Sequence, residues 1–245
     1  MKVTVLNGSP KGELSITLQY VHFLQNKFSQ HELKVFHVSQ RIKKLEKDEK
    51  VFREIIEEVR SSDGILWAFG VFVLAAPSQY MRFVELIFER GVEDAFKGKY
   101  AAVLTTSIHF FDHTAHNYMR AVCEDLNMIY ADGLSLYLQD LTDKSRRQDF
   151  IAFAENFFEA IEKRFTTARL FKPLTFINLV YEPSLPEKKI STKGKNVVVL
   201  TDAFDSNSNL GKMIDRFKQS FAEEIEVIDL NEINIIGGCL GCMRC

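Results

Sequence analysis

The first 165 residues alternate between strand-like and helix-like segments, and this alternation is the strongest constraint on the fold. Five apolar segments are predicted to be buried strands: Lys2–Leu6, Leu33–Val38, Gly64–Phe69, Tyr100–Thr106 and Ile129–Leu138. Five helices are predicted between and after them: Ser15–Phe28, Lys47–Ser61, Ser78–Arg90, Thr114–Asn127 and Ser145–Arg164. Each return to a parallel strand needs a crossover, so the pattern predicts a doubly wound, five-stranded parallel α/β sheet in the order 2-1-3-4-5. Such a sheet has a binding crevice where the order reverses, between strands 1 and 3.

Composition excludes several classes of partner. The chain has 245 residues, 46% of them apolar, and a net charge of −2, which is typical of a globular protein without a surface for nucleic acid. No apolar segment approaches the roughly 20 residues that span a bilayer. The apolar stretch at the N-terminus is too short for a signal peptide. We therefore expect no membrane partner and a cytoplasmic location.

The chain restarts after a connector. Residues 166–195 contain three prolines and several polar residues, which predicts a link between domains, although Leu174–Tyr181 is apolar enough to pack on a surface. Asn196–Thr201, Leu210–Phe221 and Ile225–Leu230 then repeat the strand, helix and strand of the first domain. We predict a first domain at 1–165 and, at 196–245, a partial second βαβ unit whose natural chain continues beyond Cys245.

The loop after the first strand is suited to a phosphate. It reads Asn7-Gly8-Ser9-Pro10-Lys11-Gly12-Glu13-Leu14-Ser15-Ile16-Thr17 and leads into a helix, whose first N–H groups lack partners. Ser9, Ser15 and Thr17 offer hydroxyls and Lys11 a positive charge. An ordinary turn in which Ser15 caps the helix remains the alternative.

These residues resemble the NAD(P)H-dependent FMN reductase family, a branch of the flavodoxin-like fold. Gly8-Ser9-Pro10-Lys11 with Ser15-Ile16-Thr17 is similar to the family's first loop. Phe69–Phe72 with Pro77–Glu85 looks like the segment after its third strand, and Gly98-Lys99-Tyr100 like the step into its fourth. The resemblance covers residues 1–165 in the order and spacing of the family.

The resemblance implies a cofactor and its contacts. Ser9, Lys11, Ser15 and Thr17 would hold the FMN phosphate. Two further groups would contact the flavin ring: Gly70, Val71, Phe72 and Val73 on one side, and the loop Thr105–His109, with Thr105, Thr106, Ser107 and His109, on the other. NAD(P)H would be the electron donor and a small molecule or a protein the acceptor. Dimers are common in the family, so a homodimer is expected.

Several residues depart from the family pattern. Gly70 and Phe72 stand where Pro and Tyr are usual, and Leu14 and Ile16 replace polar residues of the phosphate loop. Three functions therefore stay open: an NAD(P)H-linked FMN oxidoreductase, an electron carrier or redox sensor, and a scaffold that has lost flavin. No residue is identified as a proton donor.

Two further clusters invite interpretation as metal sites. His109, His113 and His116 would share a face if all three were helical, but a helix starting at Asp112 or Thr114 would leave His109 outside it. At the C-terminus, Cys239, Cys242 and Cys245 form a Cys-x-x-Cys-x-x-Cys segment. It resembles the segment that binds a [4Fe–4S] cluster in iron–sulfur flavoproteins, with inert or redox-active thiols and zinc as alternatives. The remaining Cys123 is not placed near them by any sequence feature.

Overall fold

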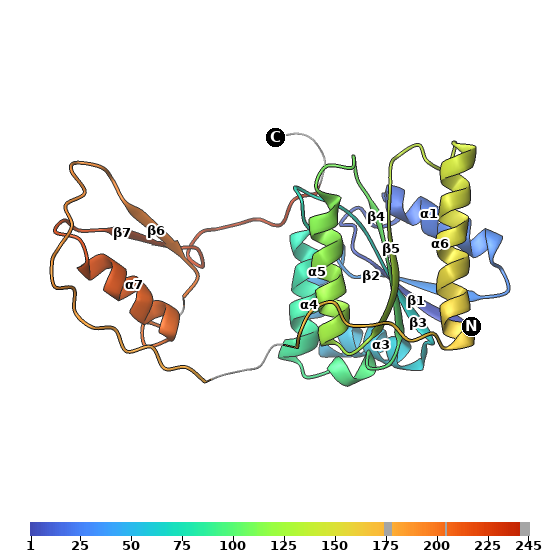
Figure 1. The fold of residues 1–245 in the computed structure, drawn as a ribbon, viewed down its shortest axis with the longest axis horizontal. Helices are drawn as coiled ribbons and strands as arrows, with labels where there is room; N and C mark the ends of the chain where they lie inside the picture. Colours follow the sequence, from blue (N-terminus) through green and yellow to red (C-terminus); the bar gives the residue numbers. More distant parts are fainter. Residues whose placement is uncertain (174–177, 204, 241–245) are drawn as a thin grey trace. The chain divides into compact units, whose positions relative to one another are not determined.

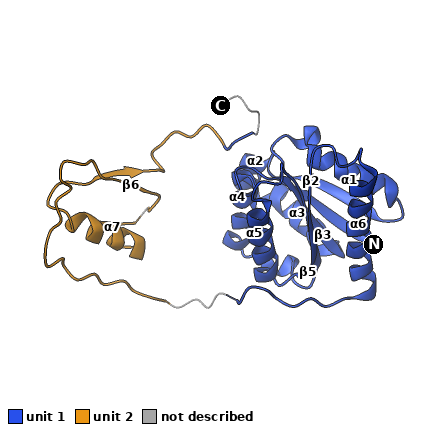
Figure 2. Cartoon of the chain, turned by 45° about the horizontal axis from the view of Figure 1, so that its top comes forward, with its two compact units in different colours: residues 1–174, 238–245 blue, residues 175–237 orange. Residues whose placement is uncertain are grey.

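The computed structural model describes residues 1–173, 178–203 and 205–240. The chain divides into two compact units, residues 1–174 with 238–245 and residues 175–237 (Figure 2). In the part of the chain that is described, no helix has the length and apolar character needed to cross a bilayer.

Unit 1 is built on a five-stranded parallel sheet. Its strands are β1 (Lys2–Asn7), β2 (Glu32–His37), β3 (Gly64–Gly70), β4 (Tyr100–Thr106) and β5 (Ile129–Leu136). They lie in the order β2-β1-β3-β4-β5, which confirms the predicted topology (Figure 1). β1 lies between β2 and β3, with Val5 paired to Val35 of β2 on one side and to Leu66 of β3 on the other.

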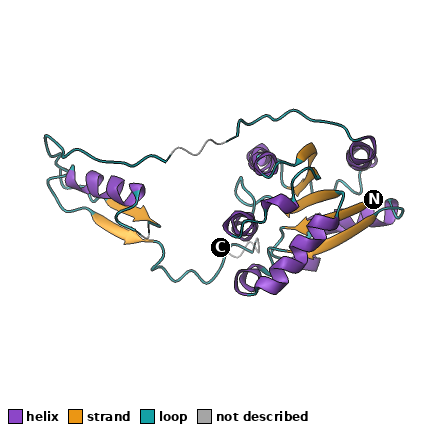
Figure 3. Cartoon of the chain, turned by 90° about the horizontal axis from the view of Figure 1, so that it is seen from below, coloured by secondary structure: helices purple, strands orange, loops and turns teal. Residues whose placement is uncertain are grey.

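Helices cover both faces of this sheet (Figure 3). They are α1 (Ile16–Lys27), α2 (Ile42–Lys47), α3 (Glu49–Ser61), α4 (Ser78–Glu89), α5 (Asp112–Asp125) and α6 (Lys144–Lys163), with short 3-10 turns η1 (Gly12–Leu14) and η2 (Glu93–Ala95). α1 and α6 pack on one face, and α2 to α5 pack on the other. α2 was not predicted, because the sequence pattern was interpreted as one helix starting at Lys47. Asp48 separates the two helices, since its side chain caps α3 by accepting a hydrogen bond from the Val51 N–H at 3.2 Å.

The core is continuous through the sheet because successive side chains of a strand point to opposite faces. Val3 and Val5 pack toward α1 and α6, whereas Leu6 packs toward α3 and α4. Trp67 of β3, the only tryptophan of the chain, is fully buried and stacks on Phe96 with ring centroids 5.8 Å apart. The sheet is therefore a rigid base for the loops at its ends.

The chain leaving α6 is bound to α5 through a buried carboxylate. Glu124 accepts hydrogen bonds from the backbone N–H of Leu170 at 2.9 and 3.0 Å and from that of Phe171 at 2.8 Å. The Arg120 Nε donates to the same carboxylate at 3.0 Å. Burial works to raise the pKa of Glu124, but these hydrogen bonds outweigh it and lower that pKa below its ordinary value.

Unit 2 is a single strand–helix–strand element. It contains β6 (Val198–Thr201), α7 (Asn209–Gln219) and β7 (Glu226–Asp229), close to the predicted segments. The two strands pair in parallel, with Val199 opposite Val227. Ser208 caps α7 by accepting a hydrogen bond from the Gly211 N–H at 3.0 Å. The domain boundaries at residues 165 and 195 remain predictions.

Candidate functional site

Three loops meet at one edge of the unit 1 sheet. β1, β3 and β4 end in register, with Asn7 opposite Ala68 and Gly70 opposite Thr106. We call these strand ends and the residues that follow them, 7–17, 70–77 and 105–111, the rim. This edge holds the carboxyl ends of the strands, where ligands bind in open α/β sheets.

The loop after β1 is held by the Asn7 side chain. Asn7 Oδ1 accepts a hydrogen bond from the Ser9 N–H at 3.0 Å, and the Gly8 N–H donates to the carbonyl of Ala68 at 2.8 Å. Gly8 also lies against the ring of Tyr80, where a Cβ atom would come within 2.6 Å of the ring. Only glycine fits this approach, and the resulting turn directs the following residues toward the start of α1.

The same loop presents uncommitted hydrogen-bond donors. Ser9, Ser15 and Thr17 are buried residues, whereas Lys11 is exposed. Ser15 stands at the N-cap of α1, yet its side chain makes no capping bond within the described structure. The first N–H groups of α1 therefore remain available, beside the Ser15 hydroxyl. In an ordinary capped turn, the Ser15 hydroxyl would be bonded to the helix. The free donors seen here instead suit a bound phosphate.

A hydrogen bond joins α1 to the end of β4. The Thr17 and Thr106 hydroxyls lie 2.7 Å apart, and the Val71 N–H donates to the Thr106 carbonyl at 2.9 Å. Thr106 thus connects residues from all three loops. The predicted residues Thr17, Val71 and Thr106 are brought together by the fold.

The loop after β3 is a tight, apolar turn. Phe72 and Ala75 exchange backbone hydrogen bonds of 2.9 and 3.1 Å, and the residues between them, Val73 and Leu74, have φ angles of 44° and 73°. Such turns ordinarily use Asn and Gly, because positive φ is costly for other side chains and most of all for β-branched ones. Val73 is nevertheless 91% exposed.

Apolar side chains of two loops surround a cavity of about 360 Å³ at the rim. Its lining is Val71, Val73, Leu74, Ser107, Ile108 and Phe110. Val71, Val73 and Ser107, which were predicted to contact opposite sides of a flat ring, line it together. The other predicted ring contacts, Gly70, Phe72, Thr105, Thr106 and His109, do not line it. Apolar walls of this kind suit an aromatic ring system, with polar groups only at its margin.

The loop after β4 carries a small polar network. The Ser107 hydroxyl donates to Asp112 Oδ2 at 3.0 Å and accepts from the His109 N–H at 2.9 Å. His109 Nδ1 lies 3.2 Å from the same carboxylate oxygen, and the Ser135 hydroxyl lies 3.1 Å from that of Ser107. Partial burial works to raise the pKa of Asp112, but hydrogen bonds from Ser135, His109 and Ser107 outweigh it and lower that pKa to about 2.

Comparison of the sequence with protein families identifies the family of this chain. The model of the NADPH-dependent FMN reductases matches residues 1–142, which include all three loops. The chain belongs to this family. Comparison with curated proteins finds no match.

Solved structures show the same fold. The NADH:FMN oxidoreductase EMOB is 15% identical, covers 64% of this chain and 87% of its own, and has a TM-score of 0.53. FerB, a flavoenzyme NAD(P)H:(acceptor) oxidoreductase from Paracoccus denitrificans, is 20% identical over 66% of this chain and 97% of its own, with a TM-score of 0.53. RosB with bound 8-demethyl-8-formylriboflavin-5'-phosphate is 13% identical over 80% of this chain and 98% of its own, with a TM-score of 0.52. The expected flavodoxin-like fold is confirmed.

FMN, the cofactor of the FMN reductase family, fits the rim. The uncommitted donors at the start of α1 suit its phosphate, and the apolar cavity suits its ring. Gly70 and Phe72, which depart from the family's usual residues, do not line that cavity. Gly70 pairs with Thr106 at the end of β3, and Phe72 closes the tight turn. The assignment of individual residues to FMN remains a prediction.

Three residues that border the rim were not predicted from the sequence. Asp112 and Ser135 complete the polar network, and Tyr80 closes the first loop while its hydroxyl donates to the Leu6 carbonyl at 2.7 Å. Asp112 stood beside the histidines and could have been found as a partner for one of them. Tyr80 lies in the Pro77–Glu85 segment that carries the family resemblance, but nothing in that segment indicated its contact with the first loop. Ser135 comes from a distant part of the sequence and carried no signal of its own.

The three histidines of this region have separate surroundings. α5 begins at Asp112, so His109 lies before the helix, as one alternative predicted. His116 is largely buried, and its Nε2 lies 2.8 Å from the Thr105 hydroxyl; burial lowers its pKa. In the described residues, no group of three or more His, Cys, Asp or Glu side chains is arranged to hold a metal ion.

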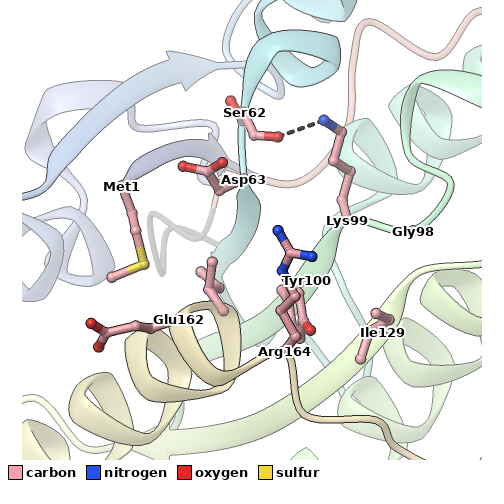
Figure 4. Close-up of a pocket in the computed structure, with 10 residues that line it drawn as sticks. Met1, Ser62, Asp63, Gly98, Lys99, Tyr100, Ile129, Glu162 and Arg164 are labelled. Carbon is pink, nitrogen blue, oxygen red and sulfur yellow. Dashed lines mark hydrogen bonds between the residues drawn. The ribbon is translucent and has the colours of Figure 1, made fainter.

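A second hollow, of about 560 Å³, lies at the opposite ends of the strands (Figure 4). Met1, Asp63 and Lys99 line it, each directly before a strand. The Lys99 Nζ donates to the carbonyl of Ser62 at 2.6 Å and to that of Arg60 at 2.7 Å, and so caps the end of α3. Burial lowers the pKa of Lys99. The Gly98-Lys99 step is thus structural, and this hollow is remote from the rim.

The cysteines divide into a core residue and a terminal segment. Cys123 is fully buried on α5, and burial raises the pKa of its thiol. Gly238 packs against Ser78 and Gln79 at the start of α4, and the Gln79 Nε2 donates to the Cys239 carbonyl at 3.4 Å. Cys242 and Cys245, the other two predicted cluster ligands, lie outside the described residues.

Proposed function

We propose that the rim of unit 1 binds FMN and that the protein uses NAD(P)H to reduce an electron acceptor. The observation that supports this most is the convergence of the uncommitted donors at Ser15 and α1 with an apolar cavity between two neighbouring loops. A flavodoxin-like scaffold that had lost its flavin would have no need for either feature. When bound, FMN supplies the two-electron chemistry between nicotinamide and acceptor.

The protein residues would bind and orient the cofactor. Ser9, Ser15 and Thr17 would donate hydroxyl hydrogen bonds to its phosphate, with Lys11 adding charge from the exposed side. Val71, Val73 and Ile108 would enclose the ring and exclude water from it. Gly70, Phe72, Thr105, Thr106, Ser107 and His109 complete the proposed set of contacts.

Cofactor titration tests this proposal. FMN added to the purified protein is expected to bind, and anaerobic NADPH or NADH is expected to bleach the absorbance near roughly 450 nm. Phe110→Ala should weaken FMN binding because it removes one wall of the cavity. Phe88→Ala, an exposed aromatic residue of α4 outside the rim, is the matched control and should bind FMN as the wild type does. Binding without bleaching would instead indicate an electron carrier, and no binding would indicate an empty scaffold.

We also propose that two copies associate through the rim. Leu14, Ile108, Phe110 and Phe111 expose half or more of their surface there, at 84%, 77%, 62% and 50%. Apolar exposure concentrated beside a cofactor site is typical of an interface. Light scattering of the purified protein should give the mass of a dimer, whereas a monomer at all concentrations would exclude this association.

The terminal cysteine segment carries a separate proposal, a [4Fe–4S] cluster held by Cys239, Cys242 and Cys245. Its support is the ligand spacing together with the position of Cys239 beside the start of α4, next to the rim. Anaerobic purification followed by analysis of iron and acid-labile sulfide tests it. Absence of both in protein that binds FMN would exclude a resident cluster.

A further inference from the structure

One histidine of the rim is oriented by a carboxylate. His109 Nδ1 lies 3.2 Å from Asp112 Oδ2, and its backbone N–H is held by Ser107 at 2.9 Å. Asp112 is itself fixed by Ser107, so the imidazole and carboxylate cannot easily separate. In this arrangement Nδ1–H faces Asp112, and the other ring nitrogen, Nε2, is left for an outside partner.

The backbone around His109 supports a functional role. His109 and Phe111 have φ angles of 57° and 54°, a conformation that L-residues adopt at a cost and retain where surrounding contacts enforce it. The His109 side chain is 45% exposed, whereas that of Asp112 is 19% exposed. The imidazole is therefore accessible while its carboxylate partner is shielded.

Other groups near His109 are poor proton donors. Asp112 on α5 is ionised at neutral pH, because its pKa is about 2. Tyr137, after β5, has its ring centroid 6.4 Å from that of His109, and its backbone N–H is held by the carboxylate of Asp140. The nearby Ser and Thr hydroxyls have no acidity in the working range. Histidine is the side chain whose charge ordinarily changes near neutral pH.

We propose that His109 is a catalytic residue that gives a proton to the acceptor during its reduction, and that Asp112 is the positioning residue that holds its imidazole. This inference rests on the proposed function. It also selects an acceptor class, namely compounds such as quinones that gain protons as well as electrons.

A quinone needs two electrons and two protons to become a hydroquinone. When bound, FMN would supply both electrons and one proton taken from NAD(P)H. The His109 imidazolium would give the second proton, and the neutral imidazole would regain a proton from solvent.

Two acceptors of different chemistry test the proton transfer. p-Benzoquinone takes up protons on reduction, whereas ferricyanide accepts one electron and no proton. With FMN-loaded protein reduced by NADPH, His109→Asn should slow reoxidation by p-benzoquinone by on the order of 100-fold, the usual lower value for loss of a general acid. The same variant should slow reoxidation by ferricyanide far less, because that reaction needs no proton and His109 is otherwise only one of several proposed FMN contacts. Asp112→Asn should slow the quinone reaction by about tenfold, because the imidazole stays but is no longer oriented.

The matched control is His113→Asn. His113 is exposed, lies one residue beyond Asp112 and is outside the polar network. Both acceptors should react with this variant at the wild-type rate. Equal slowing of both acceptors in His109→Asn would show a role in flavin binding or in structure and would overturn the proposal, as would an unchanged quinone rate.

A measurement without flavin tests the positioning contact. In apo protein, the carboxyl carbon of Asp112 should titrate with a pKa of about 2, followed by NMR. His109→Asn removes one hydrogen bond and one nearby positive charge, so this pKa should rise, while the His113→Asn control leaves it in place. An unchanged Asp112 pKa in His109→Asn would refute the pairing. Failure of the protein to bind FMN or to be reduced by NADPH would refute the proposed function itself, which is a different outcome from either result above.

Discussion

β1 and β6 each begin a strand–helix–strand element, yet their surroundings differ greatly. Val3 to Asn7 of β1 are all buried, whereas Val198 and Leu200 of β6 are 43% and 62% exposed. α1 buries five residues against the sheet, and α7 buries only Gly211 among its described residues. Similar sequence patterns thus form similar local elements in both units, but only unit 1 supplies the neighbouring strands and helices that cover them.

The comparison shows what local sequence does and does not determine. The alternation of apolar residues and the helix caps suffice to form β6, α7 and β7. They do not suffice to remove apolar surface from water, because a parallel pair of strands needs further layers on both faces. Stability in this chain should therefore be concentrated in unit 1.

The largest difference between the two units is expected in the stability lost when a leucine of β1 or of β6 is truncated. Leu6 is fully buried in β1, so Leu6→Ala should lower the free energy of unfolding of unit 1 by about 2–5 kcal/mol. Leu200→Ala in β6 should cost less than about 0.5 kcal/mol, because that side chain is already exposed. Urea unfolding followed by Trp67 fluorescence measures the first effect, and far-UV circular dichroism measures the second. Equal losses would mean that unit 2 is covered in solution.

The two helix-start serines should separate stability from binding. Ser208→Ala removes a capping bond and should destabilise α7 by about 1 kcal/mol, visible as faster hydrogen exchange in that helix. Ser15→Ala removes no such bond, so unit 1 should keep its stability while its FMN dissociation constant rises about tenfold, the effect of one lost hydrogen bond to a charged group. A stability loss in Ser15→Ala without weaker FMN binding would favour the ordinary capped turn.

A smaller effect is expected where the chain leaves unit 1. Because the pKa of Glu124 is lowered by folding, its contribution to stability is present above the ordinary pKa and is lost as the pH falls through the folded-state value. Hydrogen exchange at Leu170 and Phe171 should accordingly show less protection at about pH 3 than at about pH 7, after correction for intrinsic rates. Glu124→Gln should reduce protection there at neutral pH by about fivefold, through loss of the charge on the acceptor. Glu155→Gln on α6, which is exposed, is the control. Unchanged protection in Glu124→Gln would show that other contacts hold this segment.

Much of unit 1 could be predicted because its information is local. The strands, their order and the loops after β1, β3 and β4 follow from alternation and from the crossover rule. α2 was not predicted because it has only 6 residues, fewer than two full turns. Its two buried residues, Ile42 and Leu45, are too few to establish a periodic pattern. The hydrogen bond between Thr17 and Thr106 follows from topology, since Thr17 begins the helix after β1 and Thr106 ends β4.

The remaining features depend on residues that are distant in sequence. Ser135 joins the polar network of Ser107 and Asp112 only because β5 lies beside β4. Glu124 bonds to Leu170 only because the chain returns to α5 after α6. The left-handed conformations of Val73 and Leu74 contradict their local preference and arise only from the closing of the Phe72–Ala75 turn. Such features follow from tertiary structure and leave no local sequence pattern.

The position of Trp67 gives the protein a built-in optical reporter. It is the sole indole, fixed by its stack on Phe96, and lies three residues before Gly70, about 10 Å along β3 at the usual rise per residue. Emission from indole overlaps the absorption of oxidised flavin, so a ring seated beyond Gly70 would accept its excitation energy. Occupancy of the rim should thus be readable in the unlabelled protein as quenching that reverses when the ligand is displaced.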